Sequence, residues 1–233
     1  MSQRYNPLIQ LDNIGYIKNS KPLLANISFQ VRKNEIITIV GKNGAGKTTL
    51  CKTLIGIIKP STGKIIKQDG LKISYIPQIN DHNVLVPIRV KDFILLNSKK
   101  KLETADFGLI QQLNLENSLN KLFKDLSGGE KQKVMLLRAL LLCPDIIILD
   151  EPASNIDFSS REDMYSLINE YKGKNNFSVI MVSHDLHMVL KNTDWVLCLN
   201  EGKIGCSGVP SVVNENEILK TISSNYKYYN HKD

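Results

Sequence analysis

The fold of this chain is decided by residues 35–49, which read EIITIVGKNGAGKTT. Residues 35–40 form a compact apolar run that ends at a glycine, as expected of a buried β-strand that leads into a loop. Residues 41–48 fit the P-loop pattern G-x-x-x-x-G-K-[ST], whose glycines let successive backbone N–H groups turn toward phosphate oxygens. A helix is predicted over 47–58, stopping near Pro60, and its positive dipole end adds to the anion site. Because a buried strand precedes the loop and an amphipathic helix follows it, a nucleotide-binding loop is favoured over a chance glycine-rich turn.

The predicted ligands of this loop are the phosphates of a nucleotide and Mg²⁺. Lys47 supplies a positive charge for the β- and γ-phosphates, and the hydroxyl of Thr48 is a suitable Mg²⁺ ligand. The residues predicted to hold the phosphates are Gly41, Asn43, Gly44, Ala45, Gly46, Lys47, Thr48 and Thr49.

Two carboxylates follow a second apolar strand. Residues 146–149 are fully apolar and lead into Asp150 and Glu151, at the strand end where open α/β sheets bind ligands. Because adjacent side chains of a strand point to opposite faces, the two carboxylates are expected to do different work. Asp150 suits the Mg²⁺ shell, and Glu151 suits orienting and deprotonating an attacking water. Alone, such a pair is often a solvated turn, but about a hundred residues after a P-loop it indicates a nucleotide site.

Composition favours a cytoplasmic globular protein. The chain has 233 residues, of which 42% are hydrophobic, enough for a substantial core. No run approaches the roughly 18 to 20 apolar residues that span a bilayer, and residues 1–10 lack the pattern of a secretory signal. The formal net charge of +7 is attributed to lysines on solvated faces, since the one dense cluster, residues 99–101, has no interleaved aromatics. No nucleic-acid partner is therefore expected.

The chain has four cysteines, Cys51, Cys143, Cys198 and Cys206. They show no C-x-x-C spacing, so buried free thiols in a reducing compartment are expected. A metal site that joins the last two cysteines to His184 and His187 matches no known ligand spacing and is disfavoured.

The rest of the pattern divides the chain into a nucleotide-binding core and a helical insertion. Strand-like and helical stretches alternate toward the C-terminus, with a helix over 161–171, a buried strand over 178–182 and a closing hairpin near 200–202. Residues 90–142 instead show helical spacing and no convincing strand. The predicted fold class is α/β, a P-loop NTPase core with an antiparallel β subdomain and a helical insertion. The predicted parts are residues 1–80 with 143–222 as the core, about 85–142 as the helical subdomain, and 223–233 as a polar tail.

The pentapeptide Leu126-Ser127-Gly128-Gly129-Glu130 narrows the class of NTPase. Ser127 with Glu130 three residues on is a capping-box pattern that opens a helix. Two glycines at the cap also permit close backbone approach to a phosphate at the helix N-terminus. With this pentapeptide the chain resembles the ABC ATPases, whose signature is LSGGE. The resemblance covers nearly the whole chain, and each motif occurs in the family's order.

The resemblance implies roles for residues outside the P-loop. Tyr16, which lies 25 residues before Gly41, matches the aromatic that stacks on adenine, although an ordinary β-sheet tyrosine is the alternative. Gln78 matches the Q-loop glutamine and His184 the switch histidine at the γ-phosphate. The implied catalytic residues are Glu151, His184, Gln78 and Lys47; the implied Mg²⁺ ligands are Thr48, Gln78 and Asp150; and the implied nucleotide contacts include Ser127, Gly128, Gly129 and Asp157.

The resemblance also implies partners. In the family, the signature of one subunit completes the ATP site of another, and this chain carries one copy of each motif. Two copies are therefore expected to pair head-to-tail with two-fold symmetry around two ATP molecules. The other implied partner is an integral-membrane permease, which would hold this cytoplasmic protein at the inner face of the cell membrane.

Three stretches resemble the ATPase of bacterial zinc importers, namely residues 71–78, 86–90 and 181–208. This resemblance implies zinc as the cargo and an extracytoplasmic zinc-binding protein as an indirect partner. A motor for manganese, an iron chelate or a lipid is the alternative, and a non-transport ABC ATPase is a more distant one. The short segment between Gln78 and Leu126 favours transport, because it fits a permease-docking insertion.

Overall fold

The computed structural model describes residues 6–78, 87–96, 102–152 and 158–213, together with Ile218 and Thr221. The chain folds into two compact units, residues 1–69 with 179–233 (unit 1) and residues 70–178 (unit 2). The P-loop belongs to unit 1. The two carboxylates and the LSGGE segment belong to unit 2.

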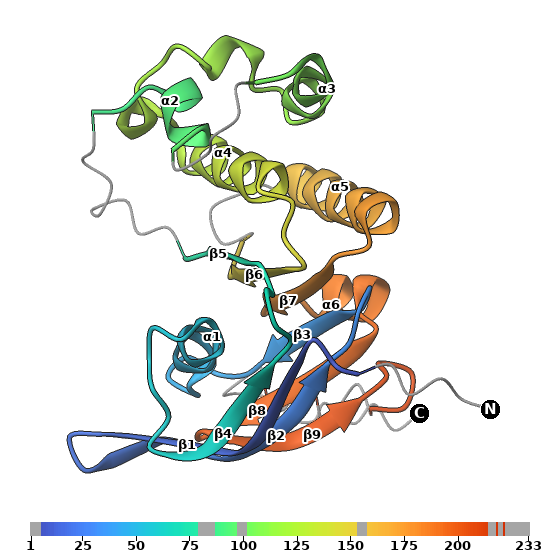
Figure 1. Ribbon diagram of the computed structural model, residues 1–233. Helices are drawn as coiled ribbons and strands as arrows, with labels where there is room; N and C mark the ends of the chain where they lie inside the picture. Colours follow the sequence, from blue (N-terminus) through green and yellow to red (C-terminus); the bar gives the residue numbers. More distant parts are fainter. Residues whose placement is uncertain are drawn as a thin grey trace, which may run out of the picture. The chain divides into compact units, whose positions relative to one another are not determined.

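Two groups of strands build unit 1 (Figure 1). β1 (Ile9–Lys18) pairs antiparallel with both β2 (Lys21–Val31) and β4 (Thr62–Lys67), in the order β2-β1-β4. β3 (Ile36–Val40) lies parallel to β7 (Ser178–Val182) and to β8 (Trp195–Asn200), and β8 pairs antiparallel with β9 (Lys203–Gly208). All residues of β3 and β7 are buried, as expected of parallel strands covered on both faces.

Unit 1 also contains α1 (Lys47–Ile55) and α6 (Leu186–Asn192). The helix predicted after the P-loop is confirmed, but it ends three residues early. Gly56 adopts φ 87° at the C-cap, a left-handed conformation that stops a helix and costs glycine little. The hairpin predicted near 200–202 is also confirmed. Glu201 and Gly202 both have positive φ there, which is the geometry of a tight turn between antiparallel strands.

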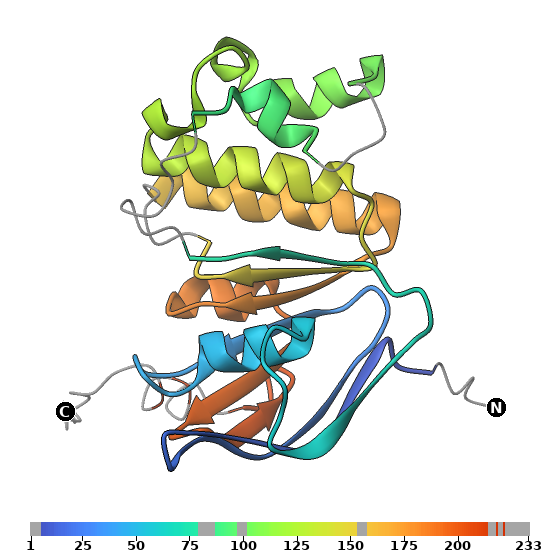
Figure 2. The same cartoon turned by 60° about the vertical axis from the view of Figure 1, so that its left-hand side comes forward.

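Unit 2 combines two parallel strands with four α-helices among its described residues. β5 (Ile73–Ile76) pairs with β6 (Ile146–Asp150). The helices are α2 (Val90–Ile94), α3 (Thr104–Gln112), α4 (Gly128–Leu141) and α5 (Phe158–Asn175), and the two short 3-10 turns are η2 (Glu116–Ser118) and η3 (Phe123–Asp125). Figure 2 shows α4 and α5 side by side, with α2 and α3 packed over α4. The helical character predicted for residues 90–142 is confirmed over its described part.

The core of the helical part is aromatic at its centre. Phe123 is 1% exposed, and its ring stacks on Phe93 with the two centroids 4.3 Å apart. The guanidinium of Arg138 lies 5.3 Å from the Phe93 centroid and donates to the carbonyl of Leu96. These contacts tie the end of α2 to α4.

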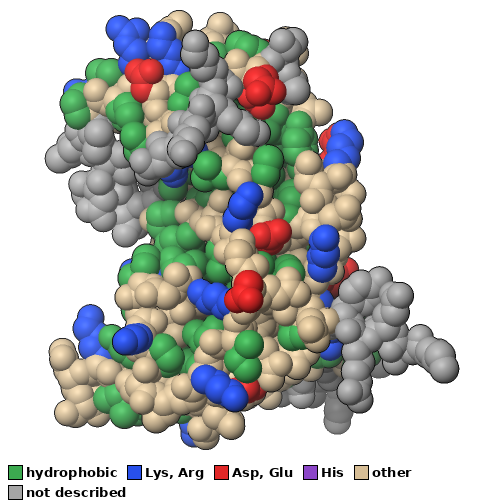
Figure 3. Space-filling view, viewed as in Figure 1, with side chains coloured by type: hydrophobic (Ala, Val, Ile, Leu, Met, Phe, Trp, Pro, Cys, Tyr) green, Lys and Arg blue, Asp and Glu red, His purple; other side chains and the backbone are tan. Residues whose placement is uncertain are grey.

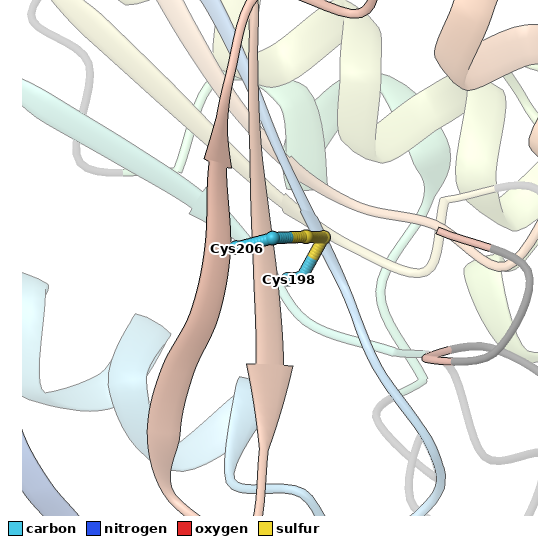
Figure 4. Close-up of a disulfide and its surroundings, with 2 residues drawn as sticks. All are labelled: Cys198 and Cys206. Atoms are coloured by element: carbon cyan, nitrogen blue, oxygen red, sulfur yellow. A yellow bond between two sulfur atoms is a disulfide. The ribbon is translucent and has the colours of Figure 1, made fainter. Parts of the chain in front are cut away.

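The expectation of four free thiols is wrong for two of them. Cys198 of β8 and Cys206 of β9 stand opposite each other in the register of the hairpin and form a disulfide (Figure 4). They lie eight positions apart in sequence, and only the antiparallel pairing brings their side chains together. Neither Cys51 nor Cys143 forms a disulfide. Cys51 is buried as expected, whereas Cys143 is exposed, so the expectation of burial is wrong for it.

The face of the molecule seen in Figure 3 is mixed in character. Figure 3 shows Lys and Arg side chains in separate groups, with neutral and hydrophobic side chains between them. None of the described helices combines the length and the apolar character that a membrane span requires.

Candidate functional site

The P-loop of unit 1 has at two points a left-handed backbone conformation that favours glycine. Gly44 and Gly46 have φ of 80° and 103°. A Cβ on Gly46 would also lie 2.8 Å from the carbonyl oxygen of Leu23, and one on Gly41 would lie 2.3 Å from that of Leu199. The loop is therefore curled against neighbouring backbone, which is the geometry that turns N–H groups toward an anion.

The side chain of Lys47 lies inside this loop and is hydrogen-bonded to its backbone. This side chain is only 5% exposed, and its ammonium donates to the carbonyl oxygens of Gly41 at 2.8 Å and Lys42 at 3.1 Å. A buried ammonium held across a loop is a strong attractor for phosphate. Thr48 is exposed in the first turn of α1. Because the N-cap Gly46 has no side chain to accept from the first-turn N–H groups, this helix terminus suits a phosphate ligand.

The β8–β9 hairpin braces the P-loop. The N–H of Gly202 donates to the carbonyl oxygen of Ala45 at 3.0 Å, and the carbonyl of Gly202 accepts from the N–H of Ala25 at 2.8 Å. A Cβ on Gly202 would lie 2.4 Å from the carbonyl oxygen of Leu23. The sequence predicts Gly202 only as part of a turn. Its contact with the P-loop could not be predicted, because more than 150 residues separate the two in the chain.

The two carboxylates of unit 2 have different surroundings. Asp150 ends β6 and is 1% exposed; one of its oxygens accepts from the Tyr75 hydroxyl at 3.1 Å. Glu151 has φ 54°, is half-buried, and accepts from the side-chain amide of Gln78 at 2.8 Å. The structure thus brings together Gln78 and Glu151, both predicted from the sequence, and it separates the environments of the two carboxylates. Tyr75 was not predicted from the sequence as a residue of this site. The one feature that could have indicated it is its position on β5, the strand that pairs with β6.

The LSGGE segment opens α4 as predicted. The Ser127 hydroxyl accepts from the N–H of Glu130 at 3.2 Å, and the Glu130 carboxylate accepts from the N–H of Ser127 at 2.9 Å. The same carboxylate accepts from the Ser118 hydroxyl at 2.9 Å and pairs with Lys121 at 3.3 Å. These donors, the Ser127 backbone first, lower the pKa of Glu130 from 4.5 to about 2. Gly128 and Gly129, which carry no side chains, then occupy the first two positions of the helix.

The remaining predicted residues are Tyr16, His184 and Asp157. Tyr16 is half-buried on β1, opposite Leu24 of β2. His184 follows β7 and is half-buried, and the next residue, Asp185, donates its N–H to the Ser183 hydroxyl at 3.1 Å. Asp157 falls within 153–157, outside the described residues. The roles of all three stay predictions.

The residues predicted to hold Mg²⁺ offer oxygen donors and no thiolate. The predicted ligands are the hydroxyl of Thr48 in unit 1 and the carboxylate of Asp150 and amide of Gln78 in unit 2, all of them oxygen donors of the kind that Mg²⁺ prefers. Within the part of the chain that the structure describes, no three His, Cys, Asp or Glu side chains are grouped to hold a metal. Cys198 and Cys206 are joined to each other, so they are not ligands.

Known proteins resemble this chain over most of its length. The ABC transporter family model matches residues 24–154. The zinc import ATP-binding protein ZnuC of Buchnera aphidicola subsp. Baizongia pistaciae is 41% identical, covering 96% of this chain and 95% of its own. That of Ehrlichia chaffeensis is 42% identical, covering 94% and 91%. A solved metal-chelate type ABC transporter in an inward-facing conformation matches with a TM-score of 0.79 at 25% identity, over 93% of this chain and 89% of that chain.

Proposed function

This chain belongs to the ABC transporter family, and on that premise we propose that it is the ATP-hydrolysing subunit of a zinc importer that works through a separate membrane permease. Similarity to zinc import ATP-binding proteins over more than nine tenths of the chain supports the cargo. The observation that carries the ATPase activity is the P-loop cradle, in which a buried ammonium lies across a glycine-rich turn at a helix N-terminus.

The residues of the chain divide the chemistry between them. Lys47 and the N–H groups of residues 41–49 bind the phosphates. Glu151 orients the attacking water and accepts its proton, and the hydrogen bond from Gln78 fixes the carboxylate for that task. His184 donates to the γ-phosphate. Mg²⁺, held by Thr48, Asp150 and Gln78, would neutralise the charge that develops on the β- and γ-phosphates.

Two copies of the chain act together in this proposal. The segment 127–129 presents a helix N-terminus without side chains at its first two positions, and we assign it to the nucleotide bound by the P-loop of a second copy. Each chain supplies one cradle and one such segment, so two-fold pairing completes two sites. Asp157 is assigned to the same junction. ATP binding would close the pair and hydrolysis would reopen it, and this cycle drives the permease at the cytoplasmic face of the membrane.

The ATPase activity is tested by substituting, one at a time, the two lysines of the P-loop. Lys47→Ala should weaken ATP binding by at least roughly tenfold and abolish hydrolysis, since it removes a charge-assisted contact to phosphate. Lys42→Ala is the matched control, because the contact of Lys42 with Lys47 is made by its backbone carbonyl, which the substitution keeps, and this variant should bind ATP normally. Equal ATP binding by both variants would refute the role of the cradle.

The pairing is tested with Glu151→Gln. This variant should bind ATP, turn over slowly and accumulate as a dimer, which light scattering would detect at saturating ATP and Mg²⁺. A monomer under these conditions counts against the head-to-tail arrangement.

The cargo is tested in cells. Deleting the gene should make growth dependent on added zinc, and neither manganese nor iron should relieve that dependence. The wild-type gene should restore growth and the Glu151→Gln variant should not. Growth that manganese or iron restores would replace zinc with that metal as the cargo.

A further inference from the structure

Tyr75 lies on the strand that borders the carboxylate strand. β5 and β6 are parallel, and Tyr75 stands opposite Ile148 in their register. The phenol leans along the strand direction, as side chains on strands do, and its hydroxyl reaches Asp150, two residues beyond its register partner, with an O···O distance of 3.1 Å. Asp150 is 1% exposed, and a carboxylate at that depth requires hydrogen-bond donors.

The same short segment also holds the second carboxylate. Gln78, three residues after Tyr75, donates to Glu151 at 2.8 Å. Pro77 stands between them, and its ring restricts the backbone that connects the two donors. Residues 75–78 therefore present one donor to each carboxylate from a single stiff stretch of chain.

We propose that Tyr75 is a positioning residue that fixes the orientation of Asp150 for Mg²⁺. The terminal torsion of an aspartate is broad and roughly two-fold, so an unrestrained carboxylate can rotate. A phenol that donates to one oxygen sets the direction of the other. Donors that hold a metal ligand in this way typically change metal affinity by 10- to 100-fold when they are removed. The proposal rests on the proposed function, because it assigns Asp150 to the Mg²⁺ of bound ATP.

The hydroxyl of Tyr75 can be tested separately from the rest of the side chain. Tyr75 lines a cavity of about 170 Å³ together with Phe93, Met135 and Arg138. Tyr75→Phe keeps the ring in that place and removes only the oxygen that contacts Asp150. Tyr171→Phe is the matched control, since it makes the same change on α5, at a tyrosine whose surroundings include Lys174 rather than a predicted Mg²⁺ ligand.

The experiment measures the coupling between Mg²⁺ and nucleotide rather than turnover. The full-length protein is titrated with a fluorescent, non-hydrolysable ATP analogue, once in EDTA and once in excess Mg²⁺, and the ratio of the two Kd values gives the gain from Mg²⁺. Tyr75→Phe should bind the analogue normally in EDTA. Its gain in affinity from Mg²⁺ should be roughly tenfold smaller than that of the wild type. Tyr171→Phe should keep the full gain, and Asp150→Asn should lose most of it.

The outcomes separate this inference from the proposed function. If Tyr75→Phe keeps the wild-type gain while Asp150→Asn loses it, the positioning role is overturned and the proposed function stands. If Tyr75→Phe instead weakens binding equally in EDTA and in Mg²⁺, the hydroxyl acts on the fold and the positioning role is also overturned. A wild-type protein that binds no analogue would overturn both proposals.

Discussion

Glu130 accepts hydrogen bonds from the backbone of Ser127, from the Ser118 hydroxyl and from Lys121, and Glu130→Gln removes the charge that these donors stabilise. The pKa of this carboxyl falls from 4.5 to about 2, chiefly through the Ser127 backbone. A lowering of that size corresponds to at most roughly 3–4 kcal/mol of stability. The side chain is 32% exposed, so solvent screening reduces the expected loss to about 1–2 kcal/mol. The glutamine can still accept from Ser127, so the capping geometry is retained.

The dependence on pH follows from the sign of the shift. The pKa of Glu130 is lower in the folded protein than in the unfolded chain, so its contribution is complete above the unfolded value of 4.5 and is lost as the pH falls toward about 2. The stability gap between wild type and Glu130→Gln should therefore be constant from pH 8 to about 5.5 and should shrink steadily below about 4.5.

The assay is unfolding of the nucleotide-free protein by urea at a series of pH values, with thermal scans in parallel. At pH 7 the variant should melt about 2–8 °C lower, since about 1 kcal/mol shifts Tm by roughly 2–4 °C in a chain of this size. Glu116→Gln makes the same change at an exposed site on η2 and should leave stability within about 0.5 kcal/mol of wild type. A stability gap that is absent at pH 7, or that widens on acidification, would refute the conclusion that the charge of Glu130 stabilises the folded protein.

Further predictions follow from single contacts. Gly202→Ala introduces a Cβ 2.4 Å from a backbone oxygen at a residue with φ 75°. The substitution should lower the free energy of unfolding by about 1–3 kcal/mol and weaken nucleotide binding, as measured by thermal unfolding and by fluorescent-ATP titration. An unchanged ATP affinity would mean that the hairpin does not brace the P-loop. Phe123→Ala should lower the free energy of unfolding by about 3–5 kcal/mol, because the ring is 1% exposed; a loss below 1 kcal/mol in urea titrations would contradict its central place in the core. Iodoacetamide should label Cys143 in the native protein and spare Cys51. In the unfolded protein it should label two thiols without reductant and four after reduction, as counted by mass spectrometry; labelling of four thiols in the unfolded protein without reductant would rule out the disulfide.

The sequence determined the parts of this protein that depend on near neighbours. The P-loop, the strand before it and the helix after it are encoded within residues 35–58, because glycine conformations, apolar runs and helix starts are local properties. The capping box of Ser127 and Glu130 was readable for the same reason, since both partners lie within one helical turn. The carboxylate pair after β6 could be placed because an apolar strand ends there.

Boundaries were less accurate where a local signal is weak. α5 runs from Phe158 to Asn175, well beyond the predicted 161–171, because polar residues on an exposed helix face carry no periodic apolar signal. α1 is shorter than predicted, since Gly56 rather than Pro60 stops it.

Only the tertiary structure decided which distant residues meet. The disulfide between Cys198 and Cys206 depends on the register of a hairpin, and the contact of Gly202 with Ala45 depends on that hairpin folding back to the P-loop. The hydrogen bond from Tyr75 to Asp150 joins residues 75 apart in sequence. Such contacts leave no pattern in one sequence, because the loop between two partners can have any composition so long as strand pairing brings its ends together.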